Sequence, residues 1–90
     1  MSERFFRATA VAGEMHLIDL PDWEPWEPSR IQYRDETEVE WLVRAGGDKR
    51  RVIRTVAQLD AAIEESKPAQ SIYLYVHECL LDEARDRRKM

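Results

Sequence analysis

Two side chains with metal-binding or nucleophilic chemistry, His77 and Cys79, lie close together in the sequence. They flank Glu78 at the end of the apolar stretch 71–76, and alternation along a strand would point both the same way. A metal site needs several converging ligands, and His16 is the only other histidine. We therefore interpret Cys79 as a small hydrophobic side chain and expect no metal. A metal- or thiol-dependent enzyme at His77 and Cys79 is the least favoured alternative.

The remaining residue patterns do not favour catalysis. No serine lies in a G-x-S-x-G elbow, and the paired acids at 35–36 and 64–65 are typical of solvated surface rather than acid–base catalysis. The segment Gly46-Gly47-Asp48-Lys49 lacks the spacing and the ending of a phosphate-binding loop. We expect no catalytic residues and no cofactor.

The segment 21–29 contains the triplet Trp-Glu-Pro twice in tandem. Proline fixes φ and removes a hydrogen-bond donor, so we expect an extended loop. Tryptophan is enriched among residues that dominate binding energy. The sequence thus predicts a protein-binding surface formed by Asp22, Trp23, Glu24, Trp26 and Glu27. The alternative, that both indoles fold onto the sheet and hold the loop there, stays open.

The charge of −4 is unevenly distributed along the sequence. Residues 14–40 hold nine acids and two arginines, a net −7, which would suit a basic partner, including a nucleic-acid-binding protein. Residues 49–54 hold four basic side chains and no acid, which could follow a phosphate backbone; they are Lys49, Arg50, Arg51 and Arg54. Because no stacking platform is evident beside this basic hairpin, nucleic-acid binding is the second hypothesis.

Strand patterns dominate the sequence. Residues 4–11 and 15–20 predict an N-terminal hairpin around Gly13, and 31–34 a further short strand. Residues 37–45 alternate apolar and polar side chains, and Gly46-Gly47-Asp48 is typical of a tight turn, so we expect a second hairpin with 50–54. Residues 71–76 are apolar on both faces and predict a central strand.

Two helices are expected. Thr55 and Gln58 have the spacing of a capping box before the helix near 56–66. A C-terminal helix near 78–88 carries a narrow apolar stripe, with 85–90 as a tail that can fray. Together the elements predict one α+β domain, 1–90, with five or six short strands in a mainly antiparallel sheet packed against the helix near 56–66. The expected core is Val39, Trp41, Val43, Val52, Leu59, Ile63, Ile72 and Leu74.

The composition favours the cytoplasm. No apolar run approaches the about 18–20 residues of a membrane span, and residues 1–7 lack the pattern of a signal peptide. A single cysteine excludes an internal disulfide. A strand edge, or the apolar pair Leu80-Leu81, could join two copies into a homodimer.

The order of hairpin, Thr-x-x-Gln-Leu helix, proline break and strand is similar to that of small α+β proteins of bacteria and their mobile elements. These include immunity or antitoxin-like proteins and phage-encoded inhibitors, such as anti-CRISPR-like inhibitors of host defence. The resemblance covers about half of the sequence. Our leading hypothesis is a non-catalytic protein that acts by binding another protein.

Overall fold

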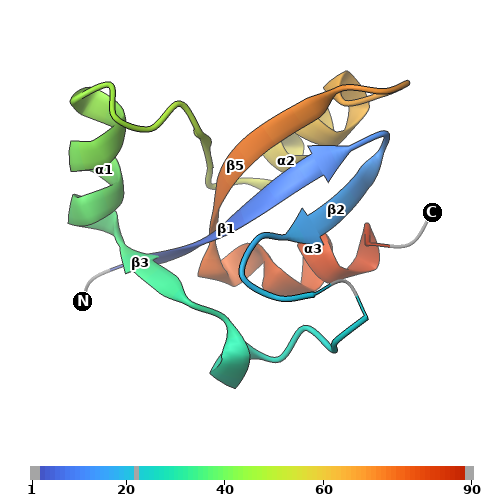
Figure 1. Ribbon diagram of the computed structural model, residues 1–90, viewed down its shortest axis with the longest axis horizontal. Helices are drawn as coiled ribbons and strands as arrows, with labels where there is room; N and C mark the ends of the chain where they lie inside the picture. Colours follow the sequence, from blue (N-terminus) through green and yellow to red (C-terminus); the bar gives the residue numbers. More distant parts are fainter. Residues whose placement is uncertain (1–2, 22, 89–90) are drawn as a thin grey trace.

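The computed structural model describes residues 3–21 and 23–88. Its centre is a mixed sheet in the order β2-β1-β5-β4, with β3 pairing the first half of β1 (Figure 1). The strands are β1 Arg4–Val11, β2 Glu14–Leu17, β3 Tyr33–Asp35, β4 Arg51–Ile53 and β5 Ser71–His77. The helices are α1 Glu36–Arg44, α2 Val56–Glu65 and α3 Leu81–Asp86, with 3-10 turns at Pro28–Arg30 and Glu78–Leu80. The predicted α+β class is confirmed.

The N-terminal hairpin forms as predicted. Ala12 and Gly13 both adopt positive φ angles, 50° and 86°, which is the geometry of a tight two-residue turn between antiparallel strands. The buried Ser66, just after α2, accepts the Gly13 N–H at 2.9 Å and donates to the Ile63 carbonyl at 2.6 Å. The turn is therefore tied to the end of α2.

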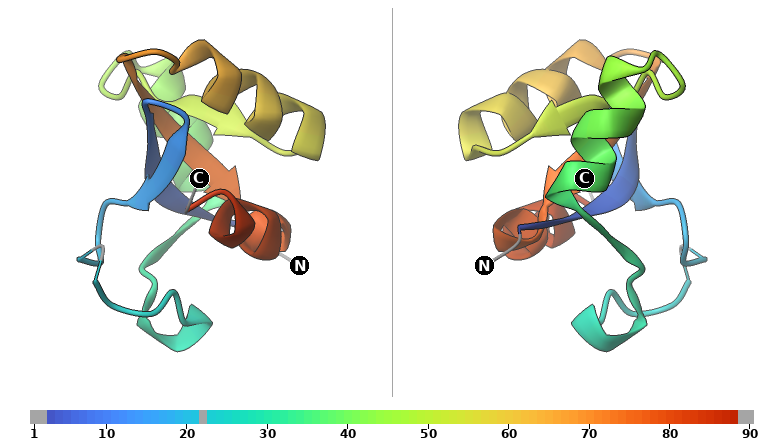
Figure 2. Two further views of the ribbon diagram at one scale, coloured as in Figure 1. Left: turned by 90° about the vertical axis from the view of Figure 1, so that its right-hand side faces the viewer. Right: turned by 90° about the vertical axis from the view of Figure 1, so that its left-hand side faces the viewer.

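One face of the sheet carries the main core. Phe6, Ala8, Leu74 and Val76 are fully buried there and pack with apolar side chains from α2 and α3. On the opposite face, α1 covers only one end of the sheet (Figure 2). There Val39 packs on Phe5 and Tyr75. The capping box of α2 is also confirmed, since the Thr55 hydroxyl accepts from the Gln58 N–H and the Gln58 side chain accepts from the Thr55 N–H.

The second hairpin prediction is wrong. Residues Glu36–Arg44 form helix α1 rather than a strand, and β4 pairs parallel to β5 instead of returning along 37–45. Asp35 begins the helix, because its carboxylate accepts the Thr37 N–H at 2.9 Å. The helix buries Val39 and leaves Trp41 59% exposed. The prediction that Trp41 belongs to the core is therefore wrong.

Val43 and Val52 are partly buried, and the other predicted core residues are buried as expected, namely Val39, Leu59, Ile63, Ile72 and Leu74.

None of the helices among the described residues has the length and apolar character needed to cross a membrane.

Candidate protein-binding surface

The loop between β2 and β3 places its two tryptophans in opposite environments. Trp26 is 3% exposed and joins the main core together with Leu20 and Ile31. Trp23 is 80% exposed. Each of the two alternatives left open by the sequence therefore holds for one indole: Trp26 is packed on the core, and Trp23 is presented to solvent.

Contacts from α3, from Arg88 just after it, and from within the loop hold this segment in place. The Arg85 guanidinium donates to the Trp26 carbonyl oxygen, and the Arg88 guanidinium lies 5.6 Å from the centre of the Trp26 ring. Arg30 forms an ion pair with Glu24 at 2.5 Å, and the Glu24 side chain is only 14% exposed. A loop held by both sets of contacts presents Trp23 on a fixed support.

The acidic residues of the predicted surface do not act together. Glu24 is neutralised by Arg30, whereas Glu27 is exposed. Asp22 lies outside the described residues. The described part of the loop therefore carries less unpaired negative charge than its sequence suggests. Trp23 is its most exposed large apolar side chain.

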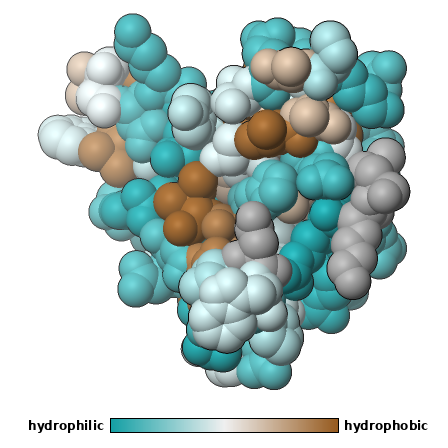
Figure 3. Space-filling model, turned by 45° about the vertical axis from the view of Figure 1, so that its right-hand side comes forward, coloured by the Kyte–Doolittle hydropathy of each residue, from teal (hydrophilic) through white to brown (hydrophobic). Residues whose placement is uncertain are grey.

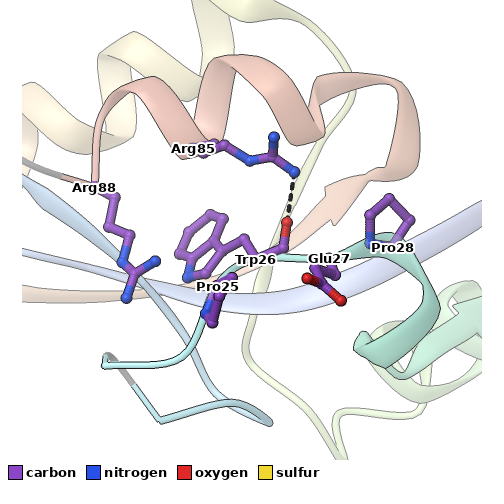
Figure 4. Close-up of a pocket in the computed structure, with 6 residues that line it drawn as sticks. All are labelled: Pro25, Trp26, Glu27, Pro28, Arg85 and Arg88. Atoms are coloured by element: carbon purple, nitrogen blue, oxygen red, sulfur yellow. Dashed lines mark hydrogen bonds between the residues drawn. The ribbon is translucent and has the colours of Figure 1, made fainter.

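A pocket of about 440 Å³ lies between the loop and the end of α3 (Figure 4). It is lined by Pro25, Trp26, Glu27, Pro28, Arg85 and Arg88. Sequence reasoning missed the two arginines, which are separated from the loop by about sixty positions in the sequence. The only available signal was that the C-terminal helix ends in basic residues.

Exposed apolar side chains occur in several places on the described surface. Ile18, just after β2, is 40% exposed, and Tyr73 on β5 is 55% exposed. Figure 3 shows hydrophobic side chains reaching the surface between hydrophilic ones. Trp41, the other exposed indole, lies on α1, away from the loop of Trp23 in Figures 1 and 2.

The basic residues 49–54 are largely neutralised by carboxylates. Arg51 donates two hydrogen bonds to Glu65, at 2.7 and 3.2 Å, and these lower the pKa of the Glu65 carboxyl. Arg54 donates to Glu36 at 2.8 Å, which lowers the pKa of that carboxyl. This pairing weakens the case for a phosphate-binding ribbon, because such a ribbon requires free positive charges.

Lys49 and Arg50 lie beside Tyr73, a proximity that the sequence did not reveal. With Asp48 and Tyr73 they line a pocket of about 210 Å³, and the Arg50 guanidinium lies 5.3 Å from the centre of the Tyr73 ring. Tyr73 is exposed because α1 covers only the far end of this sheet face. Tyr75, on the same face of β5, is 1% exposed, so this face is covered at one end and open at the other.

His77 and Cys79 share one hydrogen bond but differ in their other contacts. The His77 Nδ1 atom accepts the Cys79 N–H at 3.1 Å, and the His77 ring packs edge-on against Phe5 at 5.2 Å. Cys79 is exposed. His16 pairs with Thr9 on β1, whereas His77 pairs with Phe5, four residues away along the same strand. The described residues contain no group of three or more side chains that could hold a metal ion.

Comparisons with known protein families, with curated proteins and with solved structures find no match to this protein.

Proposed function

We propose that this protein binds another protein through the surface centred on Trp23, and that it acts without catalysis. The observation that carries the proposal is the difference in exposure between two tryptophans of one loop. Trp26 is 3% exposed and holds the loop on the core, whereas Trp23 is 80% exposed. Large exposed aromatic side chains on a fixed support are typical of binding surfaces.

The fixed support matters for affinity. Ordering a mobile loop on binding costs free energy, and a loop that is already held avoids much of this cost. Here Arg85, Arg88 and the ion pair between Arg30 and Glu24 hold the loop before any partner arrives. Covering the Trp23 indole would remove a large apolar area from water, which is favourable by about 25 cal/mol per Å².

The proposed role is that of a small inhibitor or immunity-type protein in the bacterial cytoplasm, of the kind that mobile elements encode. Support comes from its single cysteine and its net charge of −4, which favours a basic partner. A partner that itself binds nucleic acid would fit this charge.

The test compares two exposed tryptophans. Tagged protein, Trp23→Ala and Trp41→Ala are used to capture partners from bacterial lysate, and the affinity of each captured partner is then measured by calorimetry. We expect Trp23→Ala to weaken binding by about tenfold or more, as for a residue that dominates an interface, and Trp41→Ala to leave it unchanged. Equal affinities for all three proteins, or no partner at all, would overturn the proposal.

Nucleic-acid binding is a second candidate, favoured by one observation. The exposed Tyr73 ring lies beside Lys49 and Arg50, and a ring next to positive charge suits base stacking on single strands. The carboxylate partners of Arg51 and Arg54 argue against it. Fluorescence anisotropy of a labelled single-stranded oligonucleotide at low salt tests it, and no change on adding the protein ends this candidate.

A further inference from the structure

The pocket between the Trp26 loop and the end of α3 contains two arginines without a carboxylate partner among the described residues. Eight of the eleven arginines lie within 4.0 Å of a carboxylate there. The other three are Arg44, Arg85 and Arg88. Two of these three, Arg85 and Arg88, line the same pocket of about 440 Å³. Most other arginines of the described residues are paired with a carboxylate, so this pocket is unusual in holding two unpaired positive charges.

A second, independent observation points to a ligand. Trp26 is 3% exposed, and its Nε1–H is a buried donor with no hydrogen-bond partner among the described residues. Figure 4 shows the indole nitrogen on the side of the ring that faces Pro25 and Arg88, two residues that line the pocket. Leaving a buried donor unpaired costs about 1–3 kcal/mol, so an acceptor oxygen that reaches this nitrogen when the Arg88 side chain shifts would relieve an existing cost.

From these features we infer that the pocket binds a carboxylate presented by the protein partner, either that of an acidic side chain or the one at the partner's own C-terminus. A guanidinium presents donors in a planar fork that matches a carboxylate. Arg85 uses one nitrogen on the Trp26 carbonyl and keeps its other donors for a ligand. The inference relies on the proposed function for the source of this carboxylate.

The charge of the lining favours a monoanion. Arg85 and Arg88 contribute two positive charges and the exposed Glu27 one negative charge, so a single carboxylate balances the pocket. A phosphate, with a charge of about −1.5 to −2 at neutral pH, would exceed this balance. The proline and indole walls suit the apolar stem or neighbouring residues of a peptide rather than a free ion.

The experiment follows the three indole N–H signals of the whole protein by ¹H–¹⁵N NMR during titration with small probes. The probes are N-acetylglutamate amide, which offers only a side-chain carboxylate, N-acetyl-Ala-Ala with a free C-terminus, and inorganic phosphate, all at constant ionic strength. We expect saturable movement of the Trp26 signal with at least one carboxylate probe, while the signals of Trp23 and Trp41 serve as references. The stronger carboxylate probe identifies the source.

Variants separate a specific site from a general salt effect. Arg88→Gln should weaken probe binding by about tenfold or more, and Arg88→Lys, which keeps the charge but loses the fork, should lie in between. Glu27→Gln removes the negative charge and should tighten binding severalfold. Arg44→Gln, which changes an arginine far from the pocket, is the matched control and should bind like the unaltered protein.

Several results would overturn the inference: no saturable movement, equal movement of all three indole signals, tighter binding of phosphate, or an Arg88→Gln protein that binds normally. Its failure is distinguishable from that of the proposed function. A partner lost with Trp23→Ala but insensitive to Arg88→Gln would remove only the pocket. Saturable probe binding without any protein partner would remove only the proposed function.

Discussion

The phenol of Tyr75 and the carboxylate of Asp48 form an enclosed polar contact on the α1 side of the sheet. Tyr75 is 1% exposed and donates a hydrogen bond to Asp48. Burial, and then the Asp48 carboxylate, raise the pKa of Tyr75. Partial burial alone would raise the pKa of Asp48, but the hydrogen bonds from Tyr75 and the Arg50 N–H and the charge of Arg50 together lower it. Both shifts favour the same pairing of a neutral phenol with a charged carboxylate.

Tyr75→Phe should lower the free energy of unfolding by about 1 kcal/mol at neutral pH. The Asp48 contribution is present above its unfolded pKa, about 4, and is lost as pH falls through its lower folded value. The Tyr75 contribution is present below about 10 and is lost as pH rises through its higher folded value. Urea denaturation should therefore show the largest difference from the unaltered protein between these limits. A difference that does not vary with pH would contradict this account.

At the scale of elements, residues 36–44 show where sequence alone misleads. Val39, Trp41 and Val43 alternate as in a strand, and the following glycines suggest a turn. The same residues also place Val39 and Val43 four apart, on one side of a helix. Asp35 with Glu38 three positions on has the spacing of a helix start. Periodicity over so short a segment fits both structures, and packing against Phe5 and Tyr75 selects the helix.

Substitutions at 39 and 41 distinguish the two structures. In a hairpin, Val39 and Trp41 would share one buried face, and Trp41→Ala would be the costlier change. In helix α1, Val39 is fully buried and Trp41 is 59% exposed. We therefore expect Val39→Ala to cost about 2 kcal/mol and Trp41→Ala about 0.5 kcal/mol or less. Chemical denaturation measures both, and the reverse order would contradict the helix.

The elements that sequence did predict are those with redundant local signals. The N-terminal hairpin has a glycine turn between two apolar runs, and α2 has its capping box at Thr55. The pocket could not be predicted in the same way. It joins residues 25–28 to Arg85 and Arg88, and only the tertiary fold, which lays α3 against the β2–β3 loop, brings these segments together.

At the scale of the whole molecule, Trp26 connects the long loop to the main core and to α3. Its indole packs in the cluster that also holds Ala84 of α3 and Leu17 of β2, and its carbonyl accepts from Arg85. Trp23, three residues earlier, is 80% exposed. Within one loop, Trp26 is therefore expected to serve stability and Trp23 to serve binding.

Trp26→Ala should lower the free energy of unfolding by about 3–5 kcal/mol, because it empties a core position and releases the loop from α3. Small domains have a free energy of unfolding of about 5–15 kcal/mol, so this loss would remove a large fraction of it. Trp23→Ala should change stability by about 0.5 kcal/mol or less. Urea denaturation followed by circular dichroism measures both, with Trp26→Phe as an intermediate. Equal losses at the two positions would mean that Trp23 is also packed on the core, and that the loop presents no free indole to a partner.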